Sequence, residues 1–434
     1  MDDFVYQDGQ LHCEQVNLDD LAARVGTPVY VYSQRTFQQH YDRMAEAFAP
    51  IDPLICFSIK SCGNVQICKM LADRGAGMDV VSGGELYRAQ KSGVAMNKVV
   101  YAGVGKTDVE IRDALAAKIG YFNIESEAEF ENIATIAKQM GTTAHAALRV
   151  NPDVADPKTH AKTTTGAKET KFGVDLERAL RFFETYGHNQ HLQLTAIHLH
   201  LGSPIYSAAP YVRAIKKAMT LIEDLKQKGF HVTALDIGGG YAADYETGRS
   251  PSAADYAKDI VPLLGDFHRN GGKIILEPGR SIAGNAGILL TRVLYIKFGG
   301  KKKFVIIDAG MSNLIRVAMY DSFHFIWPTN VVPAHVPANR SQHMAMDGLE
   351  PCDVVGPICE TGDSLAKQRP LPPVARDDLL CIFTAGAYGM VMASNYNAIP
   401  RPAEVLISGP HATIVRRRET YEDLVSTELE AQSV

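Results

Sequence analysis

The sequence predicts an α/β protein in which a closed (β/α)8 barrel, the TIM-barrel architecture, is joined to a second, mostly antiparallel β domain. Eight short apolar runs in the first two-thirds of the 434-residue chain alternate, for the most part, with stretches of helical period. Each run ends in a polar or glycine-rich tip, as expected where barrel strands meet an active-site face. After Ile282 the pattern changes to short β segments separated by Gly and Pro turns.

The barrel is expected to occupy residues 34–283, a span close to the roughly 250 residues typical of this fold. The helix expected over Gln34–Ala47 precedes the first strand, so the barrel is expected to begin with a helix and end with a strand. The expected strands are Leu54–Lys60, Gly77–Ser82, Lys98–Gly103, Tyr121–Glu125, Thr143–Val150, Leu194–Leu201, Val232–Gly238 and Lys273–Glu277. The expected helices between them are Val65–Asp73, Val109–Lys118, Glu127–Met140, Leu176–Tyr186 and Pro210–Lys228.

The second domain is expected to combine residues 1–33 with residues 284–434. Asp8-Gly9 lies between two short β-type runs and predicts an N-terminal hairpin. The proline-containing segment Lys367–Asp378 is expected to be a loop. The expected strands of the C-terminal part are Thr291–Lys297, Lys303–Asp308, His343–Met346, Cys352–Gly356, Leu379–Thr384, Glu404–Ile407 and Ala412–Arg416.

Composition narrows the possible functions. The chain is 46% hydrophobic and 21% charged with a net charge of -5, which gives no basic surface for nucleic acid. Its start lacks a basic segment followed by an apolar one, and no apolar run is long enough for a membrane span. The seven cysteines never form Cys-x-x-Cys, which favours reduced thiols and a cytoplasmic location.

Three of the strand tips carry residues suited to a cofactor with an aldehyde and a phosphate. Lys60 can form a Schiff base, although a lysine at a strand end is by itself more often a surface residue. Gly238-Gly239-Gly240 lets backbone N–H groups approach a phosphate, or is simply a tight turn. Glu277 could pair with a protonated pyridine nitrogen, with Arg280 adding positive charge, or form a structural ion pair.

His198 and His200 are two residues apart on an expected strand, so both side chains face the same way. Metal ligation is possible, but no third ligand follows at a convincing spacing, and we expect no metal. We interpret His200 as stacking on a flat cofactor ring and His198 as a core residue.

The second domain offers further candidates. Cys359 alone would more often be a buried hydrophobe, but it lies beside Glu360 and Asp363 after a Gly-Pro turn, which suits a proton donor at a domain edge. Arg280 and Arg316 together suggest capture of a substrate carboxylate, which arginine grips with two parallel hydrogen bonds.

Taken in order, these motifs resemble the fold type III pyridoxal-phosphate decarboxylases, which have an alanine-racemase-like barrel and a β domain. The resemblance covers nearly the whole chain, from about Gly26 to about Pro402. Its distinctive segments are Asp79–Leu86, Arg149–Pro152, Lys171–Gly173, Asp236–Gly240, Glu277–Arg280, Asp308–Tyr320, Cys359–Asp363 and Gly386–Gly389.

The resemblance implies a pyridoxal 5'-phosphate cofactor. In this interpretation Lys60 carries the Schiff base, His200 stacks on the ring and Glu277 meets the pyridine nitrogen. The phosphate is expected to contact Ser203, Gly238, Gly239, Gly240, Gly279 and Arg280, with Tyr388 as a cap.

The resemblance also assigns the substrate contacts and the assembly. Cys359 would return a proton to the substrate carbanion, and the distal end of the substrate would contact Arg280, Arg316, Tyr320, Glu360 and Tyr388. In the family, the residues matching Cys359 and Glu360 reach the site from the partner subunit, so a homodimer with shared active sites is expected.

The expected activity is decarboxylation of meso-2,6-diaminopimelate to L-lysine and CO2, the last step of lysine biosynthesis. Alternatives of the same fold act on D-ornithine, lysine, carboxynorspermidine or a carrier-bound amino acid. The pair Arg280 and Arg316 favours a substrate with a second carboxylate. A non-catalytic pyridoxal-phosphate carrier would resemble the barrel alone, and a cofactor-free hydrolase would need paired catalytic carboxylates that we cannot place.

Overall fold

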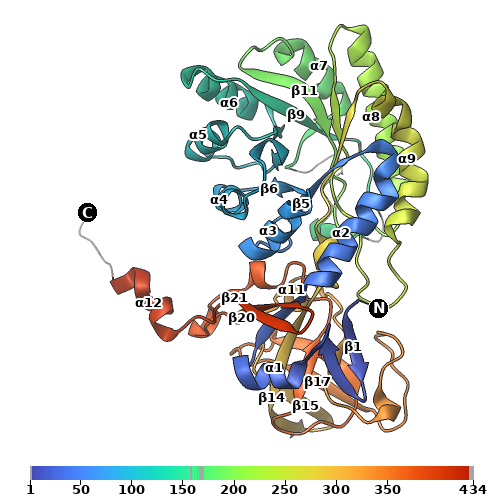
Figure 1. Ribbon diagram of the computed structural model, residues 1–434, viewed down its shortest axis with the longest axis vertical. Helices are drawn as coiled ribbons and strands as arrows, with labels where there is room; N and C mark the ends of the chain where they lie inside the picture. The colour runs from blue at the N-terminus through green and yellow to red at the C-terminus, as the bar shows by residue number, and fades with distance from the viewer. Residues whose placement is uncertain (1, 157–158, 164, 166–170, 430–434) are drawn as a thin grey trace. The chain divides into compact units, whose positions relative to one another are not determined.

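The computed structural model describes residues 2–156, 159–163, 165 and 171–429 (Figure 1). The chain divides into two compact units. The barrel unit consists of His40–Ala242 and Pro251–Ile282, and the β unit consists of Met1–Gln39, Ala243–Ser250 and Ala283–Val434. The short segment Ala243–Ser250 interrupts the barrel in sequence but belongs to the β unit.

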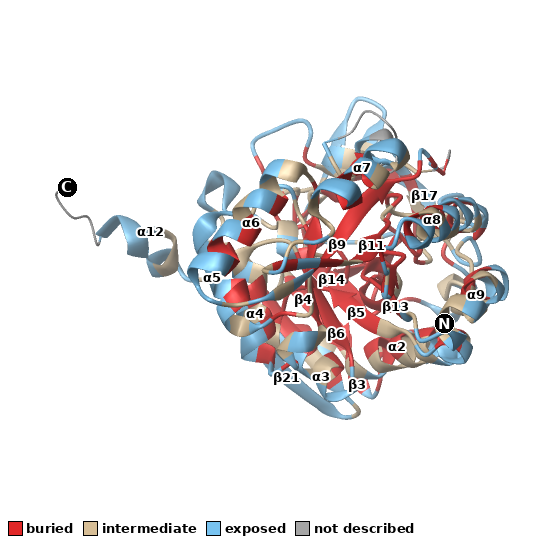
Figure 2. Ribbon diagram, turned by 90° about the horizontal axis from the view of Figure 1, so that it is seen from above, coloured by how far each residue is buried: buried red, intermediate tan, exposed pale blue. Residues whose placement is uncertain are grey.

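The barrel unit contains a closed cylinder of parallel strands, which confirms the predicted fold class (Figures 1 and 2). The strand order is β9-β11-β12-β13-β5-β6-β7-β8, and β8 pairs with β9 to close the sheet. The short strand β10 (Val174–Asp175) pairs with β9. The barrel strands are β5 (Leu54–Ser58), β6 (Gly77–Val80), β7 (Val99–Tyr101), β8 (Tyr121–Ile124), β9 (Ala144–Asn151), β11 (Leu192–His198), β12 (Ala234–Asp236) and β13 (Lys273–Leu276).

Helices alternate with these strands, and polar caps fix several of their starts. The side chain of Thr107 accepts from the backbone N–H of Glu110, and the Glu110 side chain returns to Thr107, a reciprocal cap that stabilises the first turn. Three of these helices were not predicted, since glycines open α4, Pro262 interrupts α9 and α10 has only four residues. The helices are α2 (Gln34–Phe48), α3 (Val65–Asp73), α4 (Gly83–Ser92), α5 (Asp108–Ala117), α6 (Glu127–Gln139), α7 (Leu176–Tyr186), α8 (Ala209–Gln227), α9 (Ala253–Arg269) and α10 (Arg280–Ala283).

The β unit is built on a mixed sheet that is mostly antiparallel. Its strands run in the order β18-β17-β15-β14-β4-β20-β21, with β19 pairing both β14 and β16. The pairs β15–β17 and β20–β4 are parallel. The sheet strands are β4 (Val29–Ser33), β14 (Gly287–Gly299), β15 (Lys302–Ile307), β16 (Ile326–Pro328), β17 (Glu350–Val355), β18 (Ser364–Leu371), β19 (Leu379–Ile382), β20 (Ala403–Ser408) and β21 (His411–Arg416).

The predicted N-terminal hairpin is present as β1 (Phe4–Gln7) and β2 (Gln10–Cys13), which turn at Asp8-Gly9. With β3 (Val16–Asn17) it forms a separate three-stranded sheet. The remaining helices of this unit are α1 (Leu18–Val25), α11 (Arg316–Tyr320) and α12 (Tyr421–Leu429).

Two predictions for the β unit were wrong. His343–Met346 is not a strand, because this short segment lies in a stretch of turns and has no sheet partner. The expected loop Lys367–Asp378 begins inside β18, which continues to Leu371. Pro370 is tolerated there because β18 is an edge strand and Pro370 faces Pro351 of β17, where neither residue has an N–H to donate.

Buried clusters of side chains inside the barrel pack the strands together and so fix the strand ends at which the site residues lie. Ala147, Ala196 and Ala234 form one buried cluster, and Cys56, Val100 and Ile275 form another. The polar residues analysed below follow or end these strands. Among the described helices, none is long and apolar enough to cross a membrane.

Candidate active site

Lys60 follows strand β5 and is held by a buried carboxylate. Its Nζ lies 2.7 Å from Oδ2 of Asp79 on the neighbouring strand β6, and the hydroxyl of Ser58 donates to the same oxygen at 2.5 Å. Burial raises the pKa of Asp79, and the negative charge of Glu277 raises it further. The side chain of Lys60 is 30% exposed while that of Asp79 is inaccessible, so the amine can be reached from solvent at a fixed position.

Glu85 is a second acid near Lys60 to which the sequence gave no role. It lies in the first turn of α4, its backbone N–H donates to Ser82, and its Oε2 accepts from the backbone of Val81 at 2.8 Å. Burial raises the pKa of Glu85 to about 7, against the lowering effect of Lys60. The sequence signal that could have identified Glu85 is its position directly after the end of a barrel strand.

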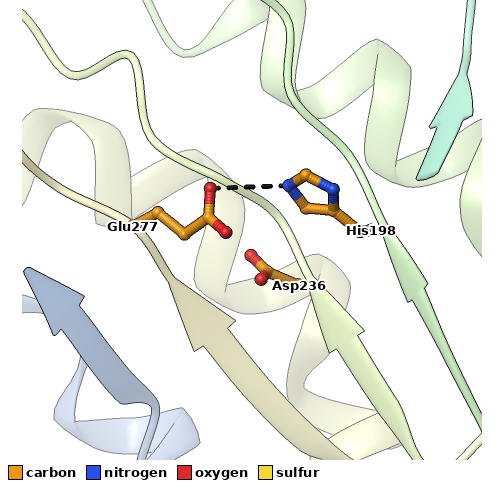
Figure 3. A group of neighbouring side chains, drawn as sticks. All are labelled: His198, Asp236 and Glu277. Carbon is orange, nitrogen blue, oxygen red and sulfur yellow. Dashed lines mark ion pairs between the residues drawn. The ribbon is translucent and has the colours of Figure 1, made fainter. Parts of the chain in front are cut away.

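Glu277 follows β13 and is surrounded by polar side chains inside the barrel (Figure 3). Asn123 donates to its Oε1 at 3.2 Å, and Nε2 of His198 lies 3.4 Å from its Oε2. Burial alone would raise the pKa of Glu277, but His198 and Lys60 outweigh it and hold that pKa well below its usual value. Glu277 is therefore a buried carboxylate that stays ionised.

His200 lies just beyond the end of β11, with Nδ1 4.0 Å from Oε2 of Glu277. Burial lowers the pKa of His200, and the positive charges of Arg149 and Lys60 lower it further. The ring is therefore neutral, as suits a residue that stacks on a planar ligand.

Two further predicted residues of the barrel unit are in contact. Nε of Arg280 donates to the hydroxyl of Ser203 at 3.0 Å, which joins a cation and a hydroxyl on one surface. The glycine turn beside them has no room for side chains, since a Cβ on Gly238 would lie 2.2 Å from the carbonyl oxygen of Leu199 and one on Gly239 would lie 2.1 Å from that of Glu277. Close backbone packing thus requires these glycines.

Arg149, near the end of β9, has hydrogen-bond donors without acceptors. Its Nη1 donates to Glu125 at 2.9 Å, while its buried Nε and Nη2 have no hydrogen-bond partner in the described part of the chain. Buried donors without acceptors are costly, so they indicate that an acceptor group of a ligand is missing here.

The β unit brings two predicted tyrosines together around Arg316, which was also predicted. The guanidinium carbon of Arg316 lies 5.9 Å from the ring centres of both Tyr320 and Tyr388, and 5.4 Å from that of Tyr245, which was not predicted. Arg316 is buried, and its Nη2 donates to Ser322 at 3.1 Å. Tyr388 has a φ of 56°, a left-handed conformation that is uncommon outside glycine and often marks functional sites.

Cys359 and Glu360 make their contacts elsewhere in the β unit. The backbone N–H of Cys359 donates to Oδ1 of Asn397 at 2.9 Å, and the hydroxyl of Tyr396 donates to Glu360 at 2.5 Å. Both residues are exposed, and Cys359 is the only exposed cysteine of the seven. The thiol is therefore accessible on the surface of its own unit.

A closed parallel barrel with an accessible lysine, a buried carboxylate and a glycine turn defines the class of pyridoxal-phosphate-dependent barrel enzymes. Residues 34–284 match the family model described as the pyridoxal binding domain of pyridoxal-dependent decarboxylases, and the chain belongs to this family.

Its full-length relatives narrow the comparison. The chain is 44% identical to a diaminopimelate decarboxylase of Aquifex aeolicus over 98% of this chain and 97% of the relative. The crystal structure of diaminopimelate decarboxylase from Helicobacter pylori complexed with L-lysine matches with a TM-score of 0.87 and 36% identity, over 95% of this chain and 100% of that one. The crystal structure of diaminopimelate decarboxylase from M. jannaschii in co-complex with L-lysine matches with a TM-score of 0.89 and 35% identity, over 98% of both chains.

Proposed function

We propose that this protein is a pyridoxal 5'-phosphate-dependent decarboxylase that converts meso-2,6-diaminopimelate to L-lysine and CO2. The observation that carries the proposal is the full-length similarity to proteins named for this reaction, at 44% identity for the Aquifex aeolicus relative. Two similar solved structures hold L-lysine, the product of the proposed reaction. The residues of the barrel unit fit the cofactor that this activity needs.

The fit rests on donors and charges that the barrel unit already presents. Lys60 offers an accessible amine for the cofactor aldehyde, and Ser203 with Arg280 and the Gly238–Gly240 turn offers donors for its phosphate. The unsatisfied N–H groups of Arg149 suit a further anionic oxygen. Glu277 offers an ionised carboxylate for the pyridine nitrogen, and His200 offers a neutral ring for stacking.

Asp79 prepares Lys60 for its reaction. An amine attacks an aldehyde only after it loses its proton, and Oδ2 of Asp79 lies 2.7 Å from Nζ of Lys60, within reach of a direct transfer. Burial raises the pKa of Asp79, which makes it a better proton acceptor than an exposed aspartate. Asp79 therefore takes the proton from Lys60 and returns it when the amine is released.

The decarboxylation step needs a place for the electron pair of the breaking bond between Cα and the carboxylate. When bound, the cofactor supplies this electron sink. Glu277 stabilises positive charge at the pyridine nitrogen by preorganised electrostatics. We assign to the thiol of Cys359 the proton that Cα gains after CO2 leaves, and an exposed thiol suits delivery to a site outside its own unit.

The substrate end that does not react is assigned to the arginine cluster of the β unit. Arg316 among Tyr320 and Tyr388 suits a carboxylate, since a guanidinium binds one through two parallel hydrogen bonds. Arg280 is assigned to the same group, and Glu360 to the distal amine. A second carboxylate distinguishes meso-diaminopimelate from lysine and ornithine.

We further propose a homodimer in which Cys359 and Glu360 serve the active site of the partner subunit. Their exposure supports this assignment, since a catalytic thiol at the surface of one unit needs a second surface to enclose it. None of the seven cysteines, all of which lie in the described part of the chain, is in a disulfide, which suits the reducing cytoplasm as the location.

The experiment that tests the function compares CO2 release from meso-diaminopimelate, L-lysine and D- and L-ornithine at equal concentrations. We expect release from meso-diaminopimelate and turnover of the others lower by at least about tenfold, the cost of leaving one charged contact unmade. Faster release from lysine or ornithine would assign the protein to a related decarboxylase instead.

The variant Arg316→Ala sharpens this test. It should raise the KM for meso-diaminopimelate by about 10- to 150-fold, the equivalent of ~1.5–3 kcal/mol for a hydrogen bond to a charged group. Cofactor affinity should stay close to that of wild type. Arg376→Ala is the matched control, because Arg376 is an exposed arginine of the same unit over Tyr295. Loss of cofactor with normal substrate binding would show that Arg316 serves the cofactor.

A further inference from the structure

Three side chains with less than 3% exposure meet at the ends of adjacent barrel strands. His198 ends β11 and is paired in register with Asp236 at the end of β12, and Glu277 follows β13 beside them. Their exposed fractions are 1%, 0% and 2%. One nitrogen of His198 and one carboxylate oxygen from each acid all lie within 4.8 Å of one another (Figure 3).

Asp236 has one oxygen that nothing in the described part of the chain satisfies. Its Oδ1 accepts from the backbone N–H of Gly238 at 2.8 Å, whereas its buried Oδ2 receives no donor. In Figure 3 the carboxyl groups of Asp236 and Glu277 point toward each other. Two ionised carboxylates at this separation in a dry interior repel strongly, so a single proton shared by the pair removes the conflict.

The surroundings decide which acid holds that proton. Glu277 has two nitrogen-bearing side chains beside it: Asn123 donates to Oε1, and Nε2 of His198 lies 3.4 Å from Oε2. Asp236 has only the backbone N–H of Gly238. The ionised form is therefore favoured on Glu277 and the neutral acid on Asp236, and burial together with the charge of Glu277 raises the pKa of Asp236 far above its usual value.

We infer that Asp236 and His198 are positioning residues for Glu277. A neutral Asp236 donates a hydrogen bond to the Glu277 carboxylate, while His198 holds the other side of that carboxylate. The pair fixes the orientation and the single negative charge of Glu277 before any ligand binds. This inference deepens the proposed function and rests on it for the group that Glu277 faces. A metal ion fits the three groups less well, because the N–H of Asn123 already points at an oxygen of Glu277.

The protonation of Asp236 can be measured without cofactor. A neutral carboxylic acid has a C=O stretch above the amide I band, and a carboxylate does not. The infrared difference between wild type and Asp236→Asn should contain one carboxylic-acid band at neutral pH, which is absent from the difference between wild type and Asp259→Asn. Asp259 is the control because it is an exposed acid on α9. A difference spectrum with carboxylate bands only would overturn the inference.

The positioning role is tested by conservative and disruptive pairs. The amide of Asp236→Asn keeps an acceptor for Gly238 and a donor for Glu277, so this variant should bind pyridoxal phosphate within about threefold of wild type. Asp236→Leu and His198→Phe should lose at least about tenfold in cofactor affinity, and His198→Gln should recover most of that loss by keeping an N–H donor. Equal losses in Asp236→Asn and Asp236→Leu would contradict a neutral aspartate.

These readouts separate the inference from the proposed function. If wild type fails to bind pyridoxal phosphate, the proposed function fails, and the infrared spectrum alone still decides whether Asp236 is neutral. If Asp236→Leu does not fold, the infrared comparison and the Asp236→Asn affinity remain, and both use a near-isosteric variant.

Discussion

The side chains predicted for the site in the barrel unit and those predicted in the β unit are in opposite states. In the barrel unit the acids Asp79, Asp236 and Glu277 are at most 2% exposed. Side chains of the same unit hold Asp79 and Glu277, and the backbone N–H of Gly238 donates to Asp236. In the β unit Cys359 and Glu360 are exposed, and Cys359 is fixed through its backbone rather than its thiol. Arg316 with its tyrosines lies between these extremes, buried but surrounded by aromatic rings.

The difference shows what holds the side chains of each unit in position. Buried charges that are hydrogen-bonded within one unit are preorganised, so their geometry needs no other surface. An exposed thiol gains a fixed position only when another surface covers it. We therefore expect variants of the barrel half to act within one chain and variants of Cys359 to depend on assembly.

The largest effect is expected at Lys60, which tests the barrel half. Lys60→Ala should remove the visible absorbance of the bound cofactor and lower turnover by at least three orders of magnitude, roughly the scale on which an enzyme loses its nucleophile. Borohydride reduction of the wild-type protein should attach the cofactor to the Lys60 side chain, as peptide mass spectrometry would detect. A reduced adduct on another lysine would refute the assignment.

Lys106 provides the matched control. Like Lys60 it has an acid partner, at 2.6 Å, but its Nζ donates to the carbonyl oxygens of Gly103 and Asn123 as well as to Glu129, and its side chain is only 1% exposed. Lys106→Met should lower stability through the unpaired Glu129 and keep the reduced adduct on Lys60. Comparison of the two variants thus distinguishes a reactive lysine from a lysine in a structural ion pair.

Sequence predicted the barrel well, because its signals are local. Each strand is a short apolar run, and the tips at Lys60, His200 and Glu277 lie at or directly after strand ends. The β unit was harder, since a strand there is defined by its partner. β4 and β16 were not predicted, and Pro370 suggested a loop where an edge strand faces a second proline.

The same distinction holds for the site. The sequence predicts that Glu277 and His200 face a ligand and that His198 is a core residue. The separation of 79 positions between His198 and Glu277 hides their 3.4 Å contact. Asp79, Glu85 and Tyr245 gained roles only from the structure. Their significance lies in contacts with residues far away in sequence, which no single-sequence pattern contains.

The second prediction tests the β half and the proposed dimer. Cys359→Ala should lower turnover by about 10²–10⁴-fold, the usual contribution of a proton donor. If Lys60 and Cys359 of one site come from different chains, equal mixing of Lys60→Ala and Cys359→Ala under subunit exchange makes about half of the dimers mixed, each with one intact site of two. The mixture should then regain about a quarter of wild-type activity.

Sedimentation of differently tagged subunits checks that exchange has occurred. Exchange without recovered turnover would place both residues in the site of the same chain. Cys359 would then act within one chain, as the residues of the barrel unit are expected to do.

The smallest effect concerns Glu85, whose environment is intermediate between the buried acids and exposed Glu360. Its pKa of about 7 in the folded protein is above the usual 4.5, so the folded state binds this proton more tightly than the unfolded state does. The resulting stabilisation is complete at low pH and is lost as pH rises through about 7. Between about pH 5 and about pH 8, the free energy of unfolding of the wild type without cofactor should fall by roughly 2–3 kcal/mol more than that of Glu85→Gln, which keeps the acceptor for Val81.

Urea midpoints of both proteins across this range measure the difference, with Glu360→Gln as an exposed-acid control. Parallel pH profiles for wild type and Glu85→Gln would mean that Glu85 titrates as an exposed acid, and the barrel half would then be more open to water than its burial indicates.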